Sequence, residues 1–474
     1  MATKIGQVAQ ELARTNPWWR DRDWVNRDPD LRKVLDANLG YRSSCLDDLV
    51  EGGLYLLRGP RRVGKTVTVK QTIESLIQQG VAPQAIIRIA ADAWSANDLR
   101  TVVQNTALPR LPTGHHRWWL FDEITATTGD WAAQIKWLRD NDPDFSQATV
   151  ILTGSNASGL TAAAGVLAGR RGQISNADRT LLPVGFRTFA RLLDPSLPDV
   201  EKIDLSSLRS EKARAAYDEL LPWLDVLVTT WEKYLSYGGF PIAVSAARAG
   251  TPVPQWFVDD IFNVVYRYTF AESRLSETST SALVERLMQS MASPVNMSKV
   301  GSELGLSQDV VSRHVHYLRD SYLLWNCPQK SESSWTERKI AQDKLYAIDP
   351  LFARLAHLRN NSRADIDLTV LVEMQVGMAV HRSAYSDGLP WAGDNFLFYV
   401  RTPSRKEIDF VSELFAGTAI EGKYVEGGNW AGEAATVNAS HFSGILATRN
   451  VLQYPLDDSA WAIPAATLCY LIDT

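Results

Sequence analysis

A glycine-bounded loop near the start of the chain has the residue types that bind phosphate. The loop matches the pattern GxxxxGK followed by Ser or Thr, and an apolar residue comes after it. These residues are Gly59, Pro60, Arg61, Arg62, Val63, Gly64, Lys65, Thr66 and Val67. Glycines let successive backbone N–H groups face phosphate oxygens at the positive end of a helix dipole. Lys65 can bridge β- and γ-phosphates, and the Thr66 hydroxyl can ligate Mg²⁺. The alternative is a structural glycine loop that matches by chance.

Two carboxylates follow the apolar run 118–121, where such a loop needs an acid at the end of a neighbouring strand. We expect Asp122 to hold the Mg²⁺ shell and Glu123 to orient and polarise the attacking water. An adjacent glutamate favours hydrolysis over phosphoryl transfer to another acceptor, so the pair predicts an ATPase rather than a kinase. Two solvated acids at a strand end are the alternative.

Polar residues after the next apolar run, and a pair of arginines, extend this set. Ser155 and Asn156 follow the run that ends at Thr153, so they can hydrogen-bond the γ-phosphate or the water, and a plain turn is an equal alternative. Arg170 and Arg171 lie in a glycine-flanked loop. An arginine directed at developing phosphate charge raises rates by roughly 10³–10⁵-fold, and an ordinary surface pair is the alternative. Because an arginine acting in trans needs a neighbouring subunit, a homo-oligomer is also predicted.

The elements around these residues follow from hydrophobic periodicity. Short apolar runs at 54–58, 85–90, 117–123 and 148–155 alternate with segments of helical spacing. Strands that alternate with helices predict a parallel sheet, with the polar residues above at the carboxyl edge of its strands. A Trp-rich lead-in, NPWWRDRDW, precedes the first run, and we interpret its tryptophans mainly as packing residues.

The ordered segments NPWWR, GPRRVGKT, WWLFDE, LTGSN, LAGRR, LLPVGFRTF and YLSYGGFP resemble a large group of bacterial and archaeal AAA-like P-loop ATPases. The resemblance covers nearly the whole chain. It implies an AAA-like ATPase core, a helical lid, a winged helix and a C-terminal module similar to restriction-endonuclease folds. One departure is Asn156, because members of the group commonly have a small hydroxyl residue there.

Residues 297–324 have the pattern of a winged helix-turn-helix, with Gly305 in the turn and Ser307 capping the second helix. If that helix entered a major groove, its contact residues would be Ser307, Gln308, Ser312, Arg313 and His316. The charge of 281–330 is almost balanced, with bases Arg286, Lys299, Arg313, Arg319 and Lys330 against acids Glu285, Glu303, Asp309 and Asp320. DNA-binding surfaces normally have a stronger basic footprint, so a helix that only packs on the core is an equal alternative.

The C-terminal region combines β-like runs with a second set of acids. The runs are KLYAID, FLFYV, EIDFVSELF, TAIEGKY, GILATRNVLQY and TLCYLI. Strand alternation places Glu421 and Lys423 on one face. Asp409 and Glu421 would then ligate Mg²⁺, and Glu373 would complete the shell. Lys423 would stabilise phosphorane charge or activate water. This set resembles the D…ExK nuclease arrangement that recurs in the group above. The alternative is a chance E-x-K, loosened by Gly422, in an inactive remnant.

Composition sets the wider limits. The chain has 474 residues, of which 45% are hydrophobic and 22% charged, and this excludes a largely disordered protein. A net charge of −5 argues against a DNA-coating protein, although a local basic patch is compatible with it. Three distant cysteines form no disulfide framework and indicate a reducing compartment. Without an apolar stretch of about 18 residues, we expect a soluble, cytoplasmic protein with no membrane partner.

Together these features predict an α/β protein with a P-loop NTPase sheet of AAA-like type, a helical lid, a winged helix-turn-helix and an α/β tail of PD-(D/E)xK type. The predicted segments are 1–45 (lead-in), 46–195 (ATPase core), 196–280 (lid), 281–340 (winged helix) and 341–474 (tail). The predicted function is a Mg²⁺-dependent ATPase, with ATP as substrate and Mg²⁺ as cofactor, coupled to a DNA transaction. The alternative is a nucleotide-dependent switch or scaffold whose inactive tail docks partners.

Overall fold

The computed structural model describes residues 2–37, 39–104, 108–109, 111, 116–155, 157–386, 396–402, 406–427 and 430–473. The chain divides into two compact units, Met1–Leu182 and Pro183–Thr474, and each contains a five-stranded sheet. The division falls before residue 195, where the sequence places the end of the ATPase core. The reason is that helix α9 (Phe186–Leu193) packs within the second unit, where the rings of Phe186 and Trp231 lie 4.8 Å apart.

The first unit alternates helices with short strands. In chain order its elements are α1 (Ala2–Thr15), α2 (Trp24–Arg27), α3 (Pro29–Asp36), β1 (Leu54–Arg58), α4 (Lys65–Gln78), β2 (Ile86–Ala90), α5 (Ala96–Val103), β3 (Trp118–Asp122), α6 (Trp131–Asn141), α7 (Pro143–Gln147), β4 (Thr149–Thr153), α8 (Ala157–Val166) and β5 (Asp178–Thr180). The loop 59–64 therefore joins a strand directly to a helix.

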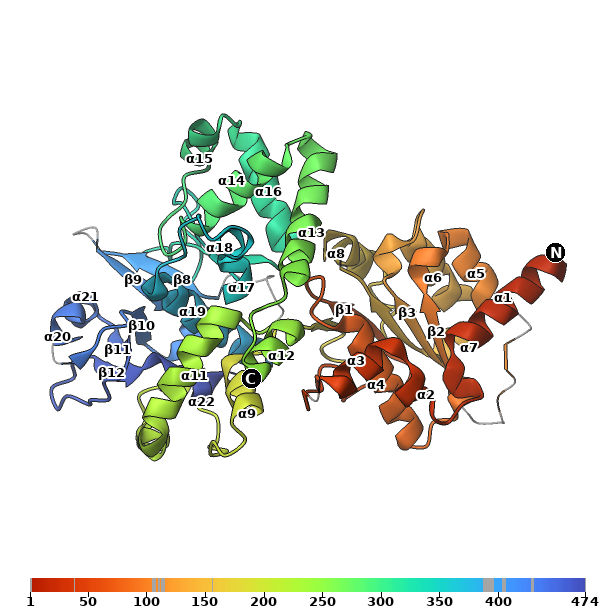
Figure 1. The fold of residues 1–474 in the computed structure, drawn as a ribbon, viewed down its shortest axis with the longest axis horizontal. Coiled ribbons are helices and arrows are strands. Elements are labelled where there is room, and N and C mark those ends of the chain that lie inside the picture. Colours follow the sequence, from red (N-terminus) through yellow and green to blue (C-terminus); the bar gives the residue numbers. More distant parts are fainter. Residues whose placement is uncertain are drawn as a thin grey trace. The chain divides into compact units, whose positions relative to one another are not determined.

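The sheet of the first unit is parallel throughout, with the strand order β2-β3-β4-β1-β5. This confirms the predicted parallel α/β sheet. Helices lie on both of its faces (Figure 1), and β3 and β4 are buried along their whole length. Because parallel neighbours end at the same edge, Asp122 at the end of β3 comes to lie beside Thr153 at the end of β4.

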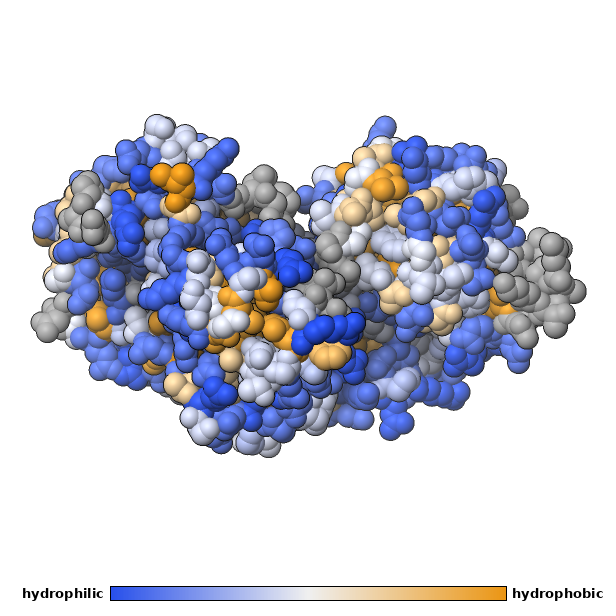
Figure 2. All heavy atoms as spheres, turned by 90° about the horizontal axis from the view of Figure 1, so that it is seen from above, coloured by the Kyte–Doolittle hydropathy of each residue, from blue (hydrophilic) through white to orange (hydrophobic). Residues whose placement is uncertain are grey.

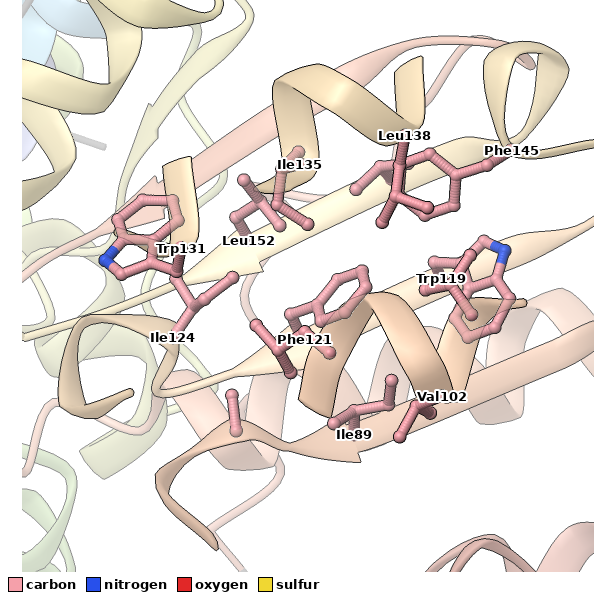
Figure 3. Close-up of a cluster of buried hydrophobic side chains, with 14 of the residues drawn as sticks. Ile89, Val102, Trp119, Phe121, Ile124, Trp131, Ile135, Leu138, Phe145 and Leu152 are labelled. Carbon is pink, nitrogen blue, oxygen red and sulfur yellow. The ribbon is translucent and has the colours of Figure 1, made fainter. Parts of the chain in front are cut away.

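One face of this sheet packs against α5, α6, α7 and α8. Figure 3 shows Trp119 and Phe121 directed towards Ile135, Leu138 and Phe145. The ring centroids of Trp119 and Phe145 are 5.8 Å apart, and those of Phe121 and Phe145 are 6.3 Å apart. Burial of apolar surface stabilises a fold by about 25 cal/mol per Å², so these large rings anchor the strands that carry the polar edge.

The N-terminal segment covers the edge strand β2. The indole Nε1 groups of Trp18 and Trp19 both donate to the carbonyl oxygen of Ile86, at 3.1 and 2.9 Å. Asn16 forms two hydrogen bonds with the backbone of Arg88. An uncovered edge would leave these backbone groups open to pairing with another chain. Trp18 is itself buried, which agrees with the interpretation of the NPWW tryptophans as packing residues.

The second unit begins with helices and ends with its sheet. In chain order its remaining elements are α10 (Glu211–Glu219), α11 (Leu224–Tyr237), α12 (Pro241–Ala249), α13 (Gln255–Ser273), α14 (Glu277–Met288), α15 (Met297–Leu304), α16 (Gln308–Asp320), β6 (Leu324–Cys327), β7 (Lys344–Ala347), α17 (Pro350–Ala353), α18 (Leu355–Arg359), α19 (Leu368–Ser386), β8 (Phe398–Arg401), β9 (Glu407–Val411), β10 (Thr418–Gly422), α20 (Trp430–Glu433), α21 (Ala435–Asn438), β11 (Ser443–Thr448), β12 (Trp461–Pro464) and α22 (Ala465–Ile472).

Two helices joined by a short turn occupy 297–320. Helix α15 ends at Leu304, and Gly305 adopts a left-handed backbone with φ +68°, which favours glycine. The Ser307 hydroxyl accepts a hydrogen bond from the N–H of Val310 and so caps α16. Val300 and Val311 are buried between the helices and their surroundings. The antiparallel pair of β6 and β7 follows.

The sheet of the second unit has the order β12-β11-β10-β9-β8. Strand β11 pairs in parallel with β10 and β12, whereas β9 pairs antiparallel with β8 and β10. Helices α19 and α22 contact this sheet. The sheet therefore mixes parallel and antiparallel strands, unlike the sheet of the first unit.

One predicted strand is wrong. The run TLCYLI (467–472) lies in helix α22, and strand β12 comes immediately before it. All eight residues of α22 are buried, so no polar side reveals its helical period. A short, wholly apolar run fits a buried strand or a buried helix equally well.

The surface is mainly hydrophilic in the view of Figure 2, with apolar residues in patches interrupted by polar ones. Among the described residues, no helix has the length and apolar character needed to cross a bilayer.

Candidate functional site

The loop 59–64 is shaped by two glycines with left-handed backbones. Gly59 has φ +143°, and a Cβ there would lie 2.2 Å from the carbonyl oxygen of Leu181. Gly64 has φ +106° and immediately precedes α4. Other residues are strained in this conformation, so the sequence can form this turn only with glycine at both ends. The turn brings the loop to the amino end of α4, where helix N–H groups without intrahelical partners face anions.

Lys65, the first residue of α4, is 5% exposed and lies over this loop. Its Nζ donates to the carbonyl oxygens of Gly59 and Pro60, both at 2.9 Å. Burial lowers the pKa of Lys65 to about 8, although Glu123 and Asp122 partly oppose that shift. The ammonium group is therefore held close to the loop by backbone oxygens, and no carboxylate of the described residues bonds to it.

Asp122 is the most heavily bonded acid of this edge. Its Oδ1 accepts from the hydroxyls of Thr153 at 2.8 Å and Thr66 at 3.3 Å. Its Oδ2 accepts from the Arg88 guanidinium at 2.5 Å. The carboxylate thus faces the first hydroxyl of α4. The Thr66 hydroxyl and the Asp122 carboxylate supply oxygen atoms, which are the ligands that Mg²⁺ prefers. The residues present therefore fit this ion.

Glu123 is held in an unusual conformation. Its backbone is left-handed, with φ +54° and ψ +43°, and its N–H donates to the Thr153 hydroxyl at 3.0 Å. Its Oε2 accepts from the Ser155 hydroxyl at 3.1 Å. A non-glycine residue in this region costs of order 1–3 kcal/mol. Two residues of the neighbouring strand end therefore fix the backbone and the side chain of this glutamate.

The structure brings most of the predicted nucleotide-site residues together. Lys65, Thr66, Asp122, Glu123 and Ser155 meet at the carboxyl edge of the sheet. Within the loop, Pro60 and Val63 are buried, Arg61 and Arg62 are exposed, and Val67 is half-buried. Asn156 lies outside the described residues.

The two arginines of the LAGRR segment bond elsewhere. Arg170 donates to Asp140 at 2.7 Å and to the carbonyl oxygen of Ala168. Arg171 pairs with Asp178 at 2.6 Å. Within the described part of the chain, both side chains therefore bond to residues other than the loop 59–64, Asp122 and Glu123.

Sequence reasoning missed Arg88, which pairs with Asp122. Its signal was a lone cation inside the apolar strand IIRIA, in a sheet that is buried on both faces. Charged side chains are almost never buried without a partner, so that position predicted an acid nearby without saying which one.

A second polar cluster lies in the second unit, where strands β7 and β9 and helix α19 meet, around another lysine that sequence reasoning missed. Lys344, at the start of β7, is 1% exposed. Its Nζ lies 3.1 Å from Asp409 Oδ1, 3.3 Å from Glu373 Oε1 and 3.4 Å from Glu407 Oε2. Burial alone lowers the pKa of Lys344, but Asp409, Glu373 and Glu407 outweigh burial and raise it above the ordinary lysine value.

Glu421 lies close to the same acids, on strand β10. It is fully buried, and neither carboxylate oxygen has a partner within the described part of the chain. Burial, followed by the charge of Asp409, raises the pKa of Glu421 to about 7. Asp409 Oδ2 accepts from the N–H of Gly422 at 3.1 Å. The predicted acids Glu373, Asp409 and Glu421 are therefore buried close to one another.

Gly422 has a different role from the loosening expected of it. A Cβ at this position would lie 3.1 Å from the Cα of Glu373 on α19, so glycine allows helix and strand to approach closely. Strand β10 ends at Gly422, and half-buried Lys423 follows it. Within the described ranges, no group of three or more His, Cys, Asp or Glu side chains is arranged to hold a metal ion.

The predicted contact face of α16 is open to solvent. Ser307, Gln308, Arg313 and His316 are exposed, and Ser312 is half-buried. The opposite side of this helix is buried through Val311, His314, Val315 and Leu318.

Two family models match separate parts of the chain. Residues 51–190 match a model described as an AAA domain. Residues 228–363 match a model described as a domain of unknown function, DUF8612. The first match contains the loop, Lys65, Asp122 and Glu123. Residues 51–190 are therefore similar to an AAA domain, which agrees with the parallel sheet and the phosphate-type loop of the first unit.

Similarity to individual proteins is more distant. An uncharacterized protein of Haemophilus influenzae is 23% identical over 314 residues, which are 63% of this chain and 68% of the relative. Among solved structures, the Walker-type ATPase of Pyrococcus abyssi is 12% identical with a TM-score of 0.38, over 71% of this chain and 95% of that one. The RuvB Holliday junction branch migration motor of Thermotoga maritima is 16% identical with a TM-score of 0.25, over 66% and 94%.

Proposed function

We propose that this protein is a Mg²⁺-dependent ATPase that binds and hydrolyses ATP and couples hydrolysis to a DNA transaction such as repair, mobile-element control or defence. The observation that carries the ATPase part is the meeting of Lys65, Thr66, Asp122 and Glu123 at one edge of a parallel sheet. These are the groups that phosphate binding, metal binding and water activation need.

Each of these residues has a distinct role in the proposed reaction. The backbone N–H groups of the loop and the Lys65 ammonium bind the phosphates of ATP. Thr66 and Asp122 would hold Mg²⁺, which would supply positive charge beside the phosphates of ATP. Glu123 orients the attacking water and takes up its proton. Ser155 acts on Glu123 and fixes the direction of its carboxylate.

A pair of substitutions tests this assignment. Lys65→Ala removes the ammonium that meets the phosphates, so both ATP binding and hydrolysis should be lost. Glu123→Gln keeps the shape and removes the base, so ATP should still bind while turnover falls by about 10²–10⁴-fold. Unchanged turnover in Lys65→Ala, measured as phosphate release, would remove the central proposal.

The DNA part of the proposal rests on the second unit. Helices α15 and α16 and the β6–β7 pair have the order of a winged helix-turn-helix, and the exposed face of α16 carries Gln308, Arg313 and His316. The test is the ATPase rate with duplex, forked and single-stranded DNA at low and high salt. Stimulation that disappears at high salt supports phosphate contacts, whereas equal rates under all conditions would contradict a DNA role.

A second candidate is a nucleotide-dependent switch or scaffold, in which the tail is an inactive nuclease-like module that docks partners. The cation among Glu373, Asp409 and Glu407 favours this candidate, because Lys344 already neutralises acids that would otherwise attract Mg²⁺. A nuclease with Glu373, Asp409, Glu421 and Lys423 in its site should cleave DNA with Mg²⁺ or Mn²⁺ and lose cleavage in Lys423→Ala. Absence of cleavage by the wild-type protein would favour the docking tail.

The homo-oligomer stays a proposal linked to Arg170. In one chain its partners are Asp140 and Ala168, so a role in hydrolysis would require it to act on a neighbouring subunit. Mass measurement with and without ATP tests this, since a protein that stays monomeric in both states could not supply an arginine in trans.

A further inference from the structure

Arg88 is a charged residue in the middle of an apolar edge strand. Its guanidinium Nη2 lies 2.5 Å from Asp122 Oδ2, with the two side chains 14% and 4% exposed. Solvent screens such a pair only weakly. This ion pair therefore controls the charge and direction of the acid that faces Thr66.

The N-terminal segment fixes the backbone that carries this guanidinium. Asn16 is fully buried, and its Oδ1 accepts from the Arg88 N–H at 2.6 Å while its Nδ2 donates to the Arg88 carbonyl oxygen at 3.0 Å. Two residues earlier in the strand, the indoles of Trp18 and Trp19 hold the Ile86 carbonyl oxygen. The position of Arg88 is thus set by groups outside the phosphate loop.

The charges of the described site leave no excess negative charge for a lone cation. Asp122 and Glu123 supply two negative charges, and Lys65 and Arg88 supply two positive ones. Arg61 adds a positive charge near Lys65, and Asp30, on which Arg88 also acts, is already paired with Lys70. Both oxygens of Asp122 are also engaged, Oδ1 by two hydroxyls and Oδ2 by Arg88. A divalent cation entering this site alone would gain no net attraction and would meet a carboxylate that is already bonded.

We propose that Arg88 is a positioning residue that makes the divalent-cation site conditional on nucleotide. It holds Asp122 with Oδ1 towards Thr66 and neutralises the carboxylate, so that Mg²⁺ enters only together with the phosphate oxygens of ATP. This inference rests on the proposed ATP site, and it adds that the free protein does not bind the metal by itself.

The test measures Mn²⁺ binding in the absence of nucleotide, by the loss of the free-ion electron paramagnetic resonance signal. Wild-type protein should not bind Mn²⁺ at this site. Arg88→Met removes the positive charge, so Mn²⁺ should bind at least about tenfold more tightly than to wild type. Arg88→Lys keeps the charge and should behave as wild type, whereas a merely structural role would make both variants alike. Circular dichroism and ATP binding in EDTA show that each variant is folded.

Two results would overturn the inference. One is nucleotide-free Mn²⁺ binding by wild type as tight as that of Arg88→Met. The other is binding to Arg88→Met that survives the added change Asp122→Asn, because the ion would then lie elsewhere. Failure of the ATPase proposal looks different: wild type would not bind ATP with or without metal, and Lys65→Ala would change nothing.

Discussion

The two units each bury a lysine beside acids, and the two lysines are held in opposite ways. Among the described residues, Lys65 bonds to backbone carbonyl oxygens alone, and burial lowers its pKa to about 8. Lys344 lies within 3.4 Å of three carboxylates, and their charge raises its pKa. Both side chains are almost completely inaccessible to solvent. The role of a buried lysine therefore depends on the groups that it contacts and not on its burial alone.

The difference separates the lysine that we propose binds phosphate from a lysine with a structural role. An ammonium without a carboxylate partner, at the amino end of a helix, is left to interact with an anion that arrives from outside. An ammonium among three acids has its charge satisfied within the protein. We therefore expect electrostatic attraction between phosphate and Lys65, and no comparable attraction at Lys344.

The largest effect that tests this comparison is expected from Lys344→Met. Removing one partner of a buried ion pair leaves the remaining charges uncompensated and costs about 3–5 kcal/mol. Burial and Asp409 already raise the pKa of Glu373 to about 7, and the variant removes the ammonium that opposes this shift. The protonated form of Glu373 is then preferred in the folded state, so the loss should be smaller at pH 5 than at pH 8. Hydrogen exchange of α19 and β9 during urea unfolding reports this unit alone.

Lys65→Met is the matched control. It removes a buried charge that has no acid bound to it, so the unligated first unit should be at least as stable as in wild type, while ATP binding is lost. Equal destabilisation by the two substitutions would break the comparison.

A smaller effect is expected in the pH dependence of ATP binding. With a pKa of about 8, Lys65 is mostly charged at neutral pH and becomes neutral as the pH rises further. Binding of phosphate needs the ammonium form, so affinity should fall by up to about tenfold per pH unit above that value, with uptake of a proton on binding. Calorimetry in buffers of different ionisation enthalpy measures the uptake. Proton release above pH 8 would show that Lys65 is not the group involved.

The smallest effect is expected from Ser155→Ala, which removes one hydrogen bond to Glu123. Such a bond contributes about 0.5–1.5 kcal/mol, so turnover should fall by roughly tenfold or less at unchanged ATP affinity, and Ser155→Thr should retain most activity. Weaker ATP binding at normal turnover would instead mean that Ser155 contacts phosphate directly. Steady-state kinetics separate the two outcomes through KM and kcat.

Local sequence patterns predicted the parts of this fold whose structure is set by residues close together in the chain. The loop from Gly59 to Thr66 lies in one short segment. Short apolar runs between segments of helical spacing predicted β1, β2, β3 and β4. The pairing of Arg88 with Asp122, and of Lys344 with Glu373 and Asp409, depends on register between distant segments that periodicity does not encode. For Arg88 the usable sign was a single cation among the apolar residues of β2, whereas Lys344 stands at the start of β7 directly after Asp343 and gave no such sign. The sequence predicted a strand where helix α22 lies, because a helix that is buried on every side shows no polar face.

The left-handed backbone of Glu123 has an evolutionary consequence. Glycine, or to a lesser degree asparagine, would occupy this conformation with less strain, so selection for stability alone would remove the glutamate. Under the proposed function, the strain at this position is the cost of placing a carboxylate beside the attacking water. In related chains that have given up hydrolysis but kept nucleotide binding, this position should therefore change before the lysine and threonine of the loop do.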